Sequence, residues 1–237
     1  MENDLLTRYA EITQKNKREI VLLRGSGCKW RRCTFCDYHL DFSPDADSNY
    51  ILNSRVLSQV TGKYGKLEVI NSGSFVDLDA KTYRLILDIC VRKHIKEVHF
   101  ESHWMHREEV GALREAFAAH GIQVRVKIGV ETFDSRYREE VLCKGIDETS
   151  PQRIAAYFDE VCLLFGLDGQ DRASMQHDIE TGLSYFDRVC INIMTENTTK
   201  VKPNRAVIDT FLTELYPLYS SNERIDILLE NTDFGVG

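Results

Sequence analysis

Short apolar runs alternate with longer amphipathic stretches along most of the chain. The short runs predict buried strands, and the stretches with apolar residues every three or four positions predict helices. We expect strands over residues 19–23, 67–70, 97–101, 123–130, 160–165, 188–194 and 225–229. We expect helices over residues 4–17, 47–60, 79–93, 106–119, 134–143, 151–157, 171–185 and 204–216.

Strand-then-helix units repeat six times before the last strand, which predicts an α/β fold with a parallel sheet covered by helices. Because six units are too few to close an eight-stranded barrel, we predict a partial (βα)6 TIM-like barrel. The 237 residues suit a single domain, with an N-terminal helix in 1–18, the barrel core in 19–200, and a C-terminal helix, extra strand and substrate-facing tail in 201–237.

Polar or glycine-containing turns follow one predicted strand after another. In barrels of this kind the reactive groups lie where the strands end and the loops begin, so these turns should meet at one edge of the sheet. They are NSGSF at 71–75, ESH at 101–103, ET at 131–132 and GLDG at 166–169.

The loop after the first strand, residues 24–42, carries three cysteines at Cys28, Cys33 and Cys36, in the spacing C-x4-C-x2-C. We refer to it as the cysteine loop. A structural zinc site normally takes four protein ligands, often from two C-x2-C pairs, and the sequence contains no second pair. Three thiolates instead favour a [4Fe–4S] cluster that keeps one iron open, with zinc as the alternative.

Four further cysteines lie in predicted helices or strands, where we expect them to be small buried apolar residues: Cys90, Cys143, Cys162 and Cys190. An odd total of seven cysteines in this arrangement favours a reducing cytoplasm over a disulfide scaffold. The net charge of −7 argues against a bulk electrostatic grip on nucleic acid, although residues 29–32 form a short basic patch. We expect neither a membrane span nor a secretory leader.

With these features the sequence resembles the radical S-adenosylmethionine (SAM) enzymes. The resemblance rests on the three cysteines, on Phe35 just before the third of them, and on the NSGSF turn after the second strand; it covers nearly the whole chain. The first gap between the cysteines is one residue longer than the commonest spacing of that superfamily. ESH, KIGVET and the pair Lys144-Gly145 also resemble the branch with the elongator catalytic subunit and archaeosine-synthesis enzymes.

Among the small stand-alone members, the sequence is most similar to the queuine lyases, which act in queuosine salvage. That resemblance implies a [4Fe–4S] cluster whose open iron is chelated by SAM, and reductive cleavage of SAM to a 5′-deoxyadenosyl radical. The radical would fragment queuine and release 7-aminomethyl-7-deazaguanine (preQ1). The partners implied are a small deazapurine substrate and an electron donor such as flavodoxin or ferredoxin, with no membrane and no nucleic acid.

The resemblance also implies cofactor contacts, all in the cysteine loop or at strand ends. Phe35 would pack on the adenine, and the turn would hold the methionine amine through Asn71, Ser72, Gly73 and Ser74. Carboxylate and ribose contacts would come from Glu101, Ser102, Lys127 and Glu131, and main-chain contacts to adenine from Gly166 and Leu167. For several of these positions a surface salt bridge or a plain turn is the competing interpretation.

A deazaguanine ring presents paired donors, and the secondary amine of queuine is cationic, so we expect acidic groups around the substrate. The candidate substrate-binding residues are Asp37, Tyr38, His39, His103, Asn192, Asn197, Glu230, Asn231, Asp233 and Phe234. Two other functions fit the same motifs: a radical enzyme that acts on a tRNA-bound nucleoside, and a zinc- or cluster-containing binding module without catalysis.

Overall fold

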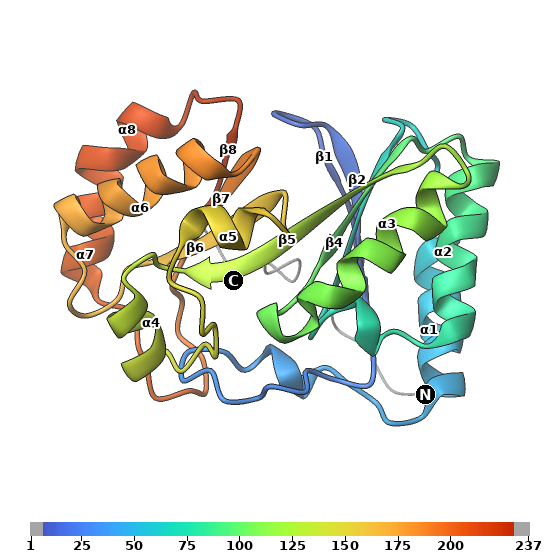
Figure 1. The fold of residues 1–237 in the computed structure, drawn as a ribbon, viewed down its shortest axis with the longest axis horizontal. Coiled ribbons are helices and arrows are strands. Elements are labelled where there is room, and N and C mark those ends of the chain that lie inside the picture. Colours follow the sequence, from blue (N-terminus) through green and yellow to red (C-terminus); the bar gives the residue numbers. More distant parts are fainter. Residues whose placement is uncertain (1–6, 230–237) are drawn as a thin grey trace.

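A single curved sheet of eight strands organises the computed structural model, which describes residues 7–229 (Figure 1). The strands lie side by side in chain order, β2 to β8 are parallel, and β1 runs antiparallel to β2. Since β1 and β8 are the two edges, the sheet forms an open half-barrel. The strands are β1 Tyr9–Ile12, β2 Arg18–Leu23, β3 Lys66–Asn71, β4 Glu97–Glu101, β5 Gln123–Glu131, β6 Glu160–Phe165, β7 Arg188–Ile193 and β8 Ile225–Leu228.

Helices cover the convex face of the sheet, with α1 to α3 along one half and α6 to α8 along the other (Figure 1). No helix among residues 7–229 is long and apolar enough to cross a membrane. The 3-10 helices are Tyr38–Leu40, Phe75–Asp77 and Trp104–Glu109, and a π-helical turn at Phe211–Leu215 joins the last two α-helices. The α-helices are α1 Ala46–Leu57, α2 Ala80–Arg92, α3 Val110–Ala118, α4 Ser135–Glu140, α5 Pro151–Ala155, α6 Arg172–Tyr185, α7 Arg205–Thr210 and α8 Tyr216–Tyr219.

The predicted partial (βα)6 barrel and the extra C-terminal strand are confirmed, but the N-terminal helix predicted over residues 4–17 is wrong in its described part. Residues 9–12 form β1 instead, and the backbone of Asn16 turns with a φ of +45° to bring the chain back into β2. The pairing of β1 with β2 satisfies the backbone groups of that edge, and Tyr9 Oη donates to Glu19 (2.8 Å). Tertiary pairing therefore overrides the helical spacing of the apolar residues.

Alternate strand residues face opposite sides of the sheet, and the two sides differ in chemistry. Residues such as Phe100, Val126 and Ile191 face the helices and belong to the main apolar core. Many of the residues that alternate with them, on the concave side, are charged and buried. The most buried of these charged residues, which we term the inner-face network, are Arg18, Glu68, His99, Lys127 and Glu160.

Ion pairs link the inner-face network across five neighbouring strands. Glu68 accepts from both Arg18 and Lys127, and His99 Nδ1 lies 3.0 Å from Glu160. Burying a charge costs several kcal/mol unless a partner compensates it, so each side chain here depends on its neighbours. Burial alone would lower the pKa of His99, but the adjacent carboxylates, Glu160 foremost, raise this pKa to about 9.

The raised pKa of His99 predicts a loss of stability in mild alkali. A group whose pKa is higher in the folded protein than in the unfolded chain contributes its full stabilisation below the unfolded pKa, near 6.5, and loses it as the pH rises through about 9. We expect the free energy of unfolding to fall across this window by about 2 kcal/mol more in the wild type than in His99→Gln. Urea unfolding of both proteins at a series of pH values measures this difference. Parallel curves would mean that His99 is not protonated in the folded protein.

Candidate active site at the carboxyl edge of the sheet

The cysteine loop crosses the carboxyl edge of the sheet and runs along the lower side of the view in Figure 1. Backbone hydrogen bonds hold it near its start and in its middle. Near its start, Ser26 N donates to Asp77 O (2.8 Å). In its middle, Thr34 N donates to Leu142 O (3.1 Å), and Thr34 O accepts from Val201 N (3.2 Å). The loop is therefore attached to segments that follow β3, β5 and β7.

Cys28, Cys33 and Cys36 are free and partly buried. Burial raises the pKa of Cys33 to about 11 and that of Cys36 to about 12, while the Lys144 ammonium acts to lower both. Thiols must lose their protons to bind a metal, so this buried cation favours the metal-binding form.

Lys144 is the site residue that the sequence assigned to no role. Its Nζ atom lies 2.6 Å from Glu131 Oε1 and 5.5 Å from the centre of the Phe35 ring. Glu131 ends β5 at a bulge, with a φ of +68°, and its Oε2 atom is buried without a hydrogen-bond partner in the described part of the chain. Lone buried acceptors are uncommon, which marks Glu131 Oε2 as a place for a donor from a ligand or water.

The turn after β3 is built tightly against the cysteine loop. Gly73 is required there, because a Cβ atom would lie 2.4 Å from Asp77 Oδ2 and 3.1 Å from Cys28 N. Asn71 Nδ2 donates to Ser74 O (3.1 Å). The turn thus brings small groups and backbone close to the first cysteine, as the sequence predicts.

Asp77 is a second residue that sequence reasoning missed. Ser74 N donates to its Oδ2 atom (2.8 Å), whereas Oδ1 is buried with no hydrogen-bond partner in the described structure. Burial raises the pKa of Asp77. The capping box that Ser74 and Asp77 form around Phe75–Asp77 could have been found from the spacing of the two residues in the turn. Ser72 donates to the carbonyl of Asp41, which ties the turn to the end of the cysteine loop.

His103 is neutral and held by its neighbours. Its Nδ1 accepts from Met105 N (3.2 Å), so Nε2 carries the proton and donates to Lys144 O (2.7 Å). Burial lowers the pKa of His103 to about 4, with the Lys144 ammonium acting in the same direction. The Trp30 ring stacks on the imidazole at 5.4 Å. A substrate contact by His103 stays a prediction.

Lys127 is more deeply buried than a surface salt bridge would be. Its ammonium pairs with Glu68 and lies 3.2 Å from Glu101, which is at the carboxyl end of β4. Ser102, the next residue, donates its N–H to Lys127 O (3.0 Å). Burial raises the pKa of Glu101, an effect that Lys127 opposes. The cofactor roles predicted for these three residues stay predictions, and Lys127 has a clear structural role in the inner-face network.

Gly166 and Leu167 lie just after β6 and already use part of their backbone. Gly166 O accepts from Asn204 N (2.7 Å), and Leu167 N donates to Gln170 Oε1 (2.9 Å). The Leu167 side chain is fully buried in a small apolar cluster with Phe35 and Met194. Their contact with adenine stays a prediction.

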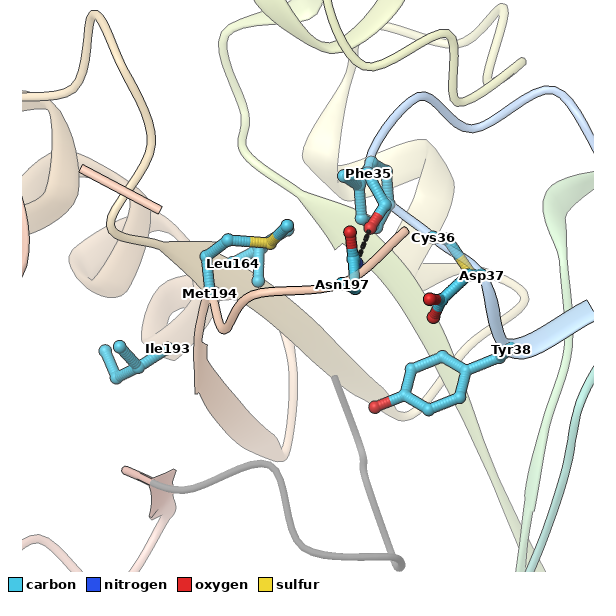
Figure 2. Close-up of a pocket in the computed structure, with 8 residues that line it drawn as sticks. All are labelled: Phe35, Cys36, Asp37, Tyr38, Leu164, Ile193, Met194 and Asn197. Carbon is cyan, nitrogen blue, oxygen red and sulfur yellow. Dashed lines mark hydrogen bonds between the residues drawn. The ribbon is translucent and has the colours of Figure 1, made fainter. Parts of the chain in front are cut away.

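A pocket that is partly open to solvent lies between the cysteine loop and the ends of β6 and β7 (Figure 2). Figure 2 shows the loop residues on one side of it, facing Leu164 and Met194. The amide of Asn197 closes one side by donating to Phe35 O (2.7 Å). The lining residues are Phe35, Cys36, Asp37, Tyr38, Leu164, Ile193, Met194 and Asn197.

Several predicted substrate residues surround or underlie this pocket. Asp37 Oδ2 accepts from Thr198 N (3.1 Å), so its carboxylate fixes the segment after β7 to the cysteine loop. Asn192 is buried on the concave side of β7, and its Nδ2 atom has no partner among the described residues. Tyr38 lines the pocket directly, whereas Asn192 offers a free donor from within the barrel.

Other predicted residues fall outside what the structure describes. Glu230, Asn231, Asp233 and Phe234 lie beyond residue 229, and the side chain of His39 is likewise outside the described set. Cys90, Cys162 and Cys190 are buried as expected, but the prediction for Cys143 is wrong. It follows the end of α4 with a φ of +53° and is partly exposed, close enough to act electrostatically on Cys33.

Comparison with known proteins identifies the family. No family model matches the chain. It is 25% identical over 154 residues to an uncharacterised protein of Methanocaldococcus jannaschii, a match that covers 57% of this chain but spans about two fifths of that protein's length. A solved structure, the queuine lyase from Clostridium spiroforme bound to SAM and queuine, is 41% identical. The match covers 98% of this chain and 99% of the lyase, with a TM-score of 0.92.

The chain belongs to the queuine lyase family. The resemblance inferred from the cysteines and the NSGSF turn is thereby confirmed at the level of family and fold. The roles of individual site residues remain predictions for this member.

Membership of the queuine lyase family implies a [4Fe–4S] cluster. The cysteines fit such a cluster in the type of donor they supply and in their location. Cys28, Cys33 and Cys36 are free thiols on one loop at the carboxyl edge, next to the Lys144 cation. As their side chains stand, no three His, Cys, Asp or Glu residues within 7–229 are set closely enough to hold a metal ion. The fit therefore rests on the type of donor and its location.

The pairing of Lys144 with Glu131 predicts that the effects of the two residues on the stability of this queuine lyase family member are strongly coupled. Lys144→Met leaves a buried carboxylate without its cation and should destabilise the metal-free protein by about 2–4 kcal/mol. Adding Glu131→Gln should recover part of that loss, because no uncompensated charge is then buried. Urea unfolding of the single and double variants measures the coupling. The control is the mostly exposed pair Arg136–Glu140 (3.0 Å), where Arg136→Met should lower the free energy of unfolding by under about 1 kcal/mol. If the losses of stability from the Lys144 and Glu131 variants simply added in the double variant, the pairing would be contradicted.

Proposed function

We propose that this chain is a radical SAM enzyme that fragments queuine and releases preQ1 in queuosine salvage. The observation that carries the proposal is the 41% identity, over nearly the whole length of both chains, to a queuine lyase whose structure contains SAM and queuine. The cysteine loop at the carboxyl edge supports it independently, because the three thiols lie where such a barrel places its reactive groups. The proposed reaction class is that of a lyase acting on a carbon–nitrogen bond.

The proposed cofactors are a [4Fe–4S] cluster and SAM, which together supply a 5′-deoxyadenosyl radical when an electron is delivered. Cys28, Cys33 and Cys36 would hold the cluster as thiolates. Lys144 would stabilise the negative charge of those thiolates, since its ammonium lies in the same buried space as Cys33 and Cys36. The partly buried position of the loop would limit contact between the bound cluster and water.

Buried acceptors without partners support a cationic, hydroxyl-rich ligand beside the cysteine loop. Asp77 Oδ1 lies by the turn that contains Gly73, and Glu131 Oε2 lies by Phe35 and Lys144. SAM carries an amine and two ribose hydroxyls, all of which donate hydrogen bonds, and Phe35 presents a face for its adenine. We assign Asp77 with Asn71, Ser72, Gly73 and Ser74 to the amine side of SAM, and Glu131 to the ribose.

The substrate would occupy the space above the inner-face network, next to the pocket at Tyr38 and Asn197 (Figure 2). Asn192 offers it a hydrogen-bond donor from β7. The chain must keep water away from the C–H bond that is attacked, and the apolar Leu164 and Met194 beside Cys36 serve this purpose. A reducing cytoplasm is the compartment that we propose, because the thiols must remain free.

Loss of one loop cysteine should abolish cluster binding without unfolding the chain. We expect Cys33→Ala to contain almost no iron and sulfide after anaerobic reconstitution, because a three-thiolate site has no spare ligand. Cys143→Ala is the matched control, since Cys143 acts electrostatically on Cys33 but lies outside the proposed ligand set, and it should load fully. Zinc without iron in the wild type, or equal loss in both variants, would contradict the assignment.

The substrate is tested by turnover. Incubation of the reduced holoenzyme with SAM and queuine should yield preQ1 and 5′-deoxyadenosine, both detected by mass spectrometry. Asn192→Ala should raise the KM for queuine by about tenfold or less, as expected for the loss of one hydrogen bond to a ligand. Cleavage of SAM without formation of preQ1 would point to another substrate, and a tRNA-bound nucleoside is the first alternative to test.

A further inference from the structure

The residue before β1 lies at the same edge of the sheet as the cysteine loop. Because β1 runs antiparallel to β2, its first residue, Tyr9, is paired with Val21 near the carboxyl end of β2. Arg8 continues this pairing by one residue, since its carbonyl accepts from Leu22 N (3.0 Å). The antiparallel direction of β1 therefore brings Arg8 to the carboxyl edge, where the parallel strands place the site.

Arg8 binds the end of the cysteine loop through a bidentate ion pair. Its Nη1 atom donates to Asp41 Oδ2 (3.0 Å), and its Nη2 atom donates to Asp41 Oδ1 (2.9 Å). Water competes little with this pair, because the Arg8 side chain is 6% exposed and that of Asp41 is 22% exposed. Two parallel hydrogen bonds fix the plane of the carboxylate as well as its position, which a single point charge would not do. Asp41 is thereby held in one orientation.

The backbone of Asp41 is in turn bonded to the turn after β3. The Ser72 hydroxyl donates to Asp41 O, and Ser72 is itself buried. Ser72 belongs to the NSGSF turn, which we assign to the amine side of SAM. The path from Arg8 to this turn thus consists of one ion pair, one residue of backbone and one hydrogen bond.

Close packing also joins the end of the cysteine loop to this turn. Phe42 forms a backbone bridge with Gly25, and Ser43 N donates to Gly25 O (3.1 Å). Gly25 has no room for a side chain, since a Cβ atom there would lie 2.7 Å from Asp77 O. A displacement of Asp41 would therefore be transmitted to the turn, because closely packed groups move together.

We propose that Arg8 is a positioning residue for SAM: by holding the Asp41 carboxylate, it fixes the carbonyl to which Ser72 donates, and so keeps the NSGSF turn in the conformation that receives the amine of SAM. The proposal rests on the proposed function, which assigns this turn to SAM. Arg8 acts through Asp41 and Ser72 and touches neither the cluster nor SAM in this assignment. It gives β1 a role in the site, in addition to its pairing with β2.

The test removes the ion pair of Arg8 and compares the result with loss of another ion pair made with β1. Arg8→Met keeps a long side chain but loses both donors to Asp41. The matched control is Lys63→Met, because Lys63 pairs with Glu11 (2.7 Å) near the opposite end of β1. Each variant loses one positive charge next to the same strand. The KM for SAM is measured from the 5′-deoxyadenosine that the holoenzyme forms with dithionite and saturating queuine.

We expect Arg8→Met to raise the KM for SAM by about tenfold, because the apparent affinity falls with the fraction of protein whose turn is correctly placed. The kcat at saturating SAM should change by less than about twofold, since bound SAM restores the turn. Arg8→Lys keeps the charge but not the bidentate geometry and should lie between the wild type and Arg8→Met. An unchanged KM in Arg8→Met, or an equal rise in Lys63→Met, would overturn the proposal.

A double variant tests the path through Ser72. Ser72→Ala removes the hydrogen bond to Asp41 O, so adding Arg8→Met to it should raise the KM for SAM no further. Independent effects would multiply instead, and a further rise of more than about threefold would overturn this path. Asp41→Asn breaks the same ion pair from the other side and serves if Arg8→Met does not fold.

Hydrogen exchange of the metal-free protein gives a readout that needs neither cluster nor SAM. The amides of residues 71–77 should exchange at least about threefold faster in Arg8→Met than in the wild type, because their turn opens more often. They should be unchanged in Lys63→Met, and the amides of β5 should be unchanged in both variants. Mass spectrometry of the corresponding peptides measures the rates. Wild-type exchange of residues 71–77 in Arg8→Met would contradict the proposal.

These readouts separate the proposal from the proposed function. If the wild-type holoenzyme forms no 5′-deoxyadenosine from SAM with dithionite, the proposed function fails. Hydrogen exchange then still decides whether Arg8 holds the turn. If the wild type is active and Arg8→Met has the same KM for SAM, the proposed function stands and the positioning role of Arg8 fails.

Discussion

The site depends on how the cysteine loop is attached across the carboxyl edge of the half-barrel. A loop of this length would be free to move if only its ends were fixed. Ser26 is bonded to the turn after β3, and Thr34 is bonded both to the segment after β5 and to the one after β7. Because these backbone hydrogen bonds join segments far apart in the sequence, the position of the thiols is set by the whole sheet rather than by the loop alone.

The concave side of the sheet supplies a second constraint, which acts from below the site. Charged side chains replace the apolar layers that usually fill a barrel interior. They are tolerated because each has a partner: Glu68 is shared by Arg18 and Lys127, and His99 lies against Glu160. Glu101, which contacts Lys127, extends these contacts to the carboxyl edge of the sheet. Charge at the site is therefore coupled to charge that holds the fold together.

Much of this arrangement was predictable, and the failures have physical causes. The strands and most helices follow from apolar periodicity, and the cysteine spacing with the NSGSF turn indicated both the site and the family. Periodicity misassigned residues 9–12, whose fate depends on pairing with β2. It also placed Cys143 in a helix that in fact ends at Glu140. Lys144 and Asp77 were missed because their importance lies in burial and in unpaired or ion-paired atoms, which appear only when distant segments are brought together.

The central claim is that the cysteine loop holds a [4Fe–4S] cluster with one iron available to SAM. Electron paramagnetic resonance of the dithionite-reduced, reconstituted protein, recorded with and without SAM, tests this claim most directly. The account predicts the signal of a reduced [4Fe–4S] cluster whose shape changes when SAM is added, because SAM then becomes a ligand of the open iron. A cluster signal that SAM leaves unchanged, or a protein with no such signal at all, would contradict it.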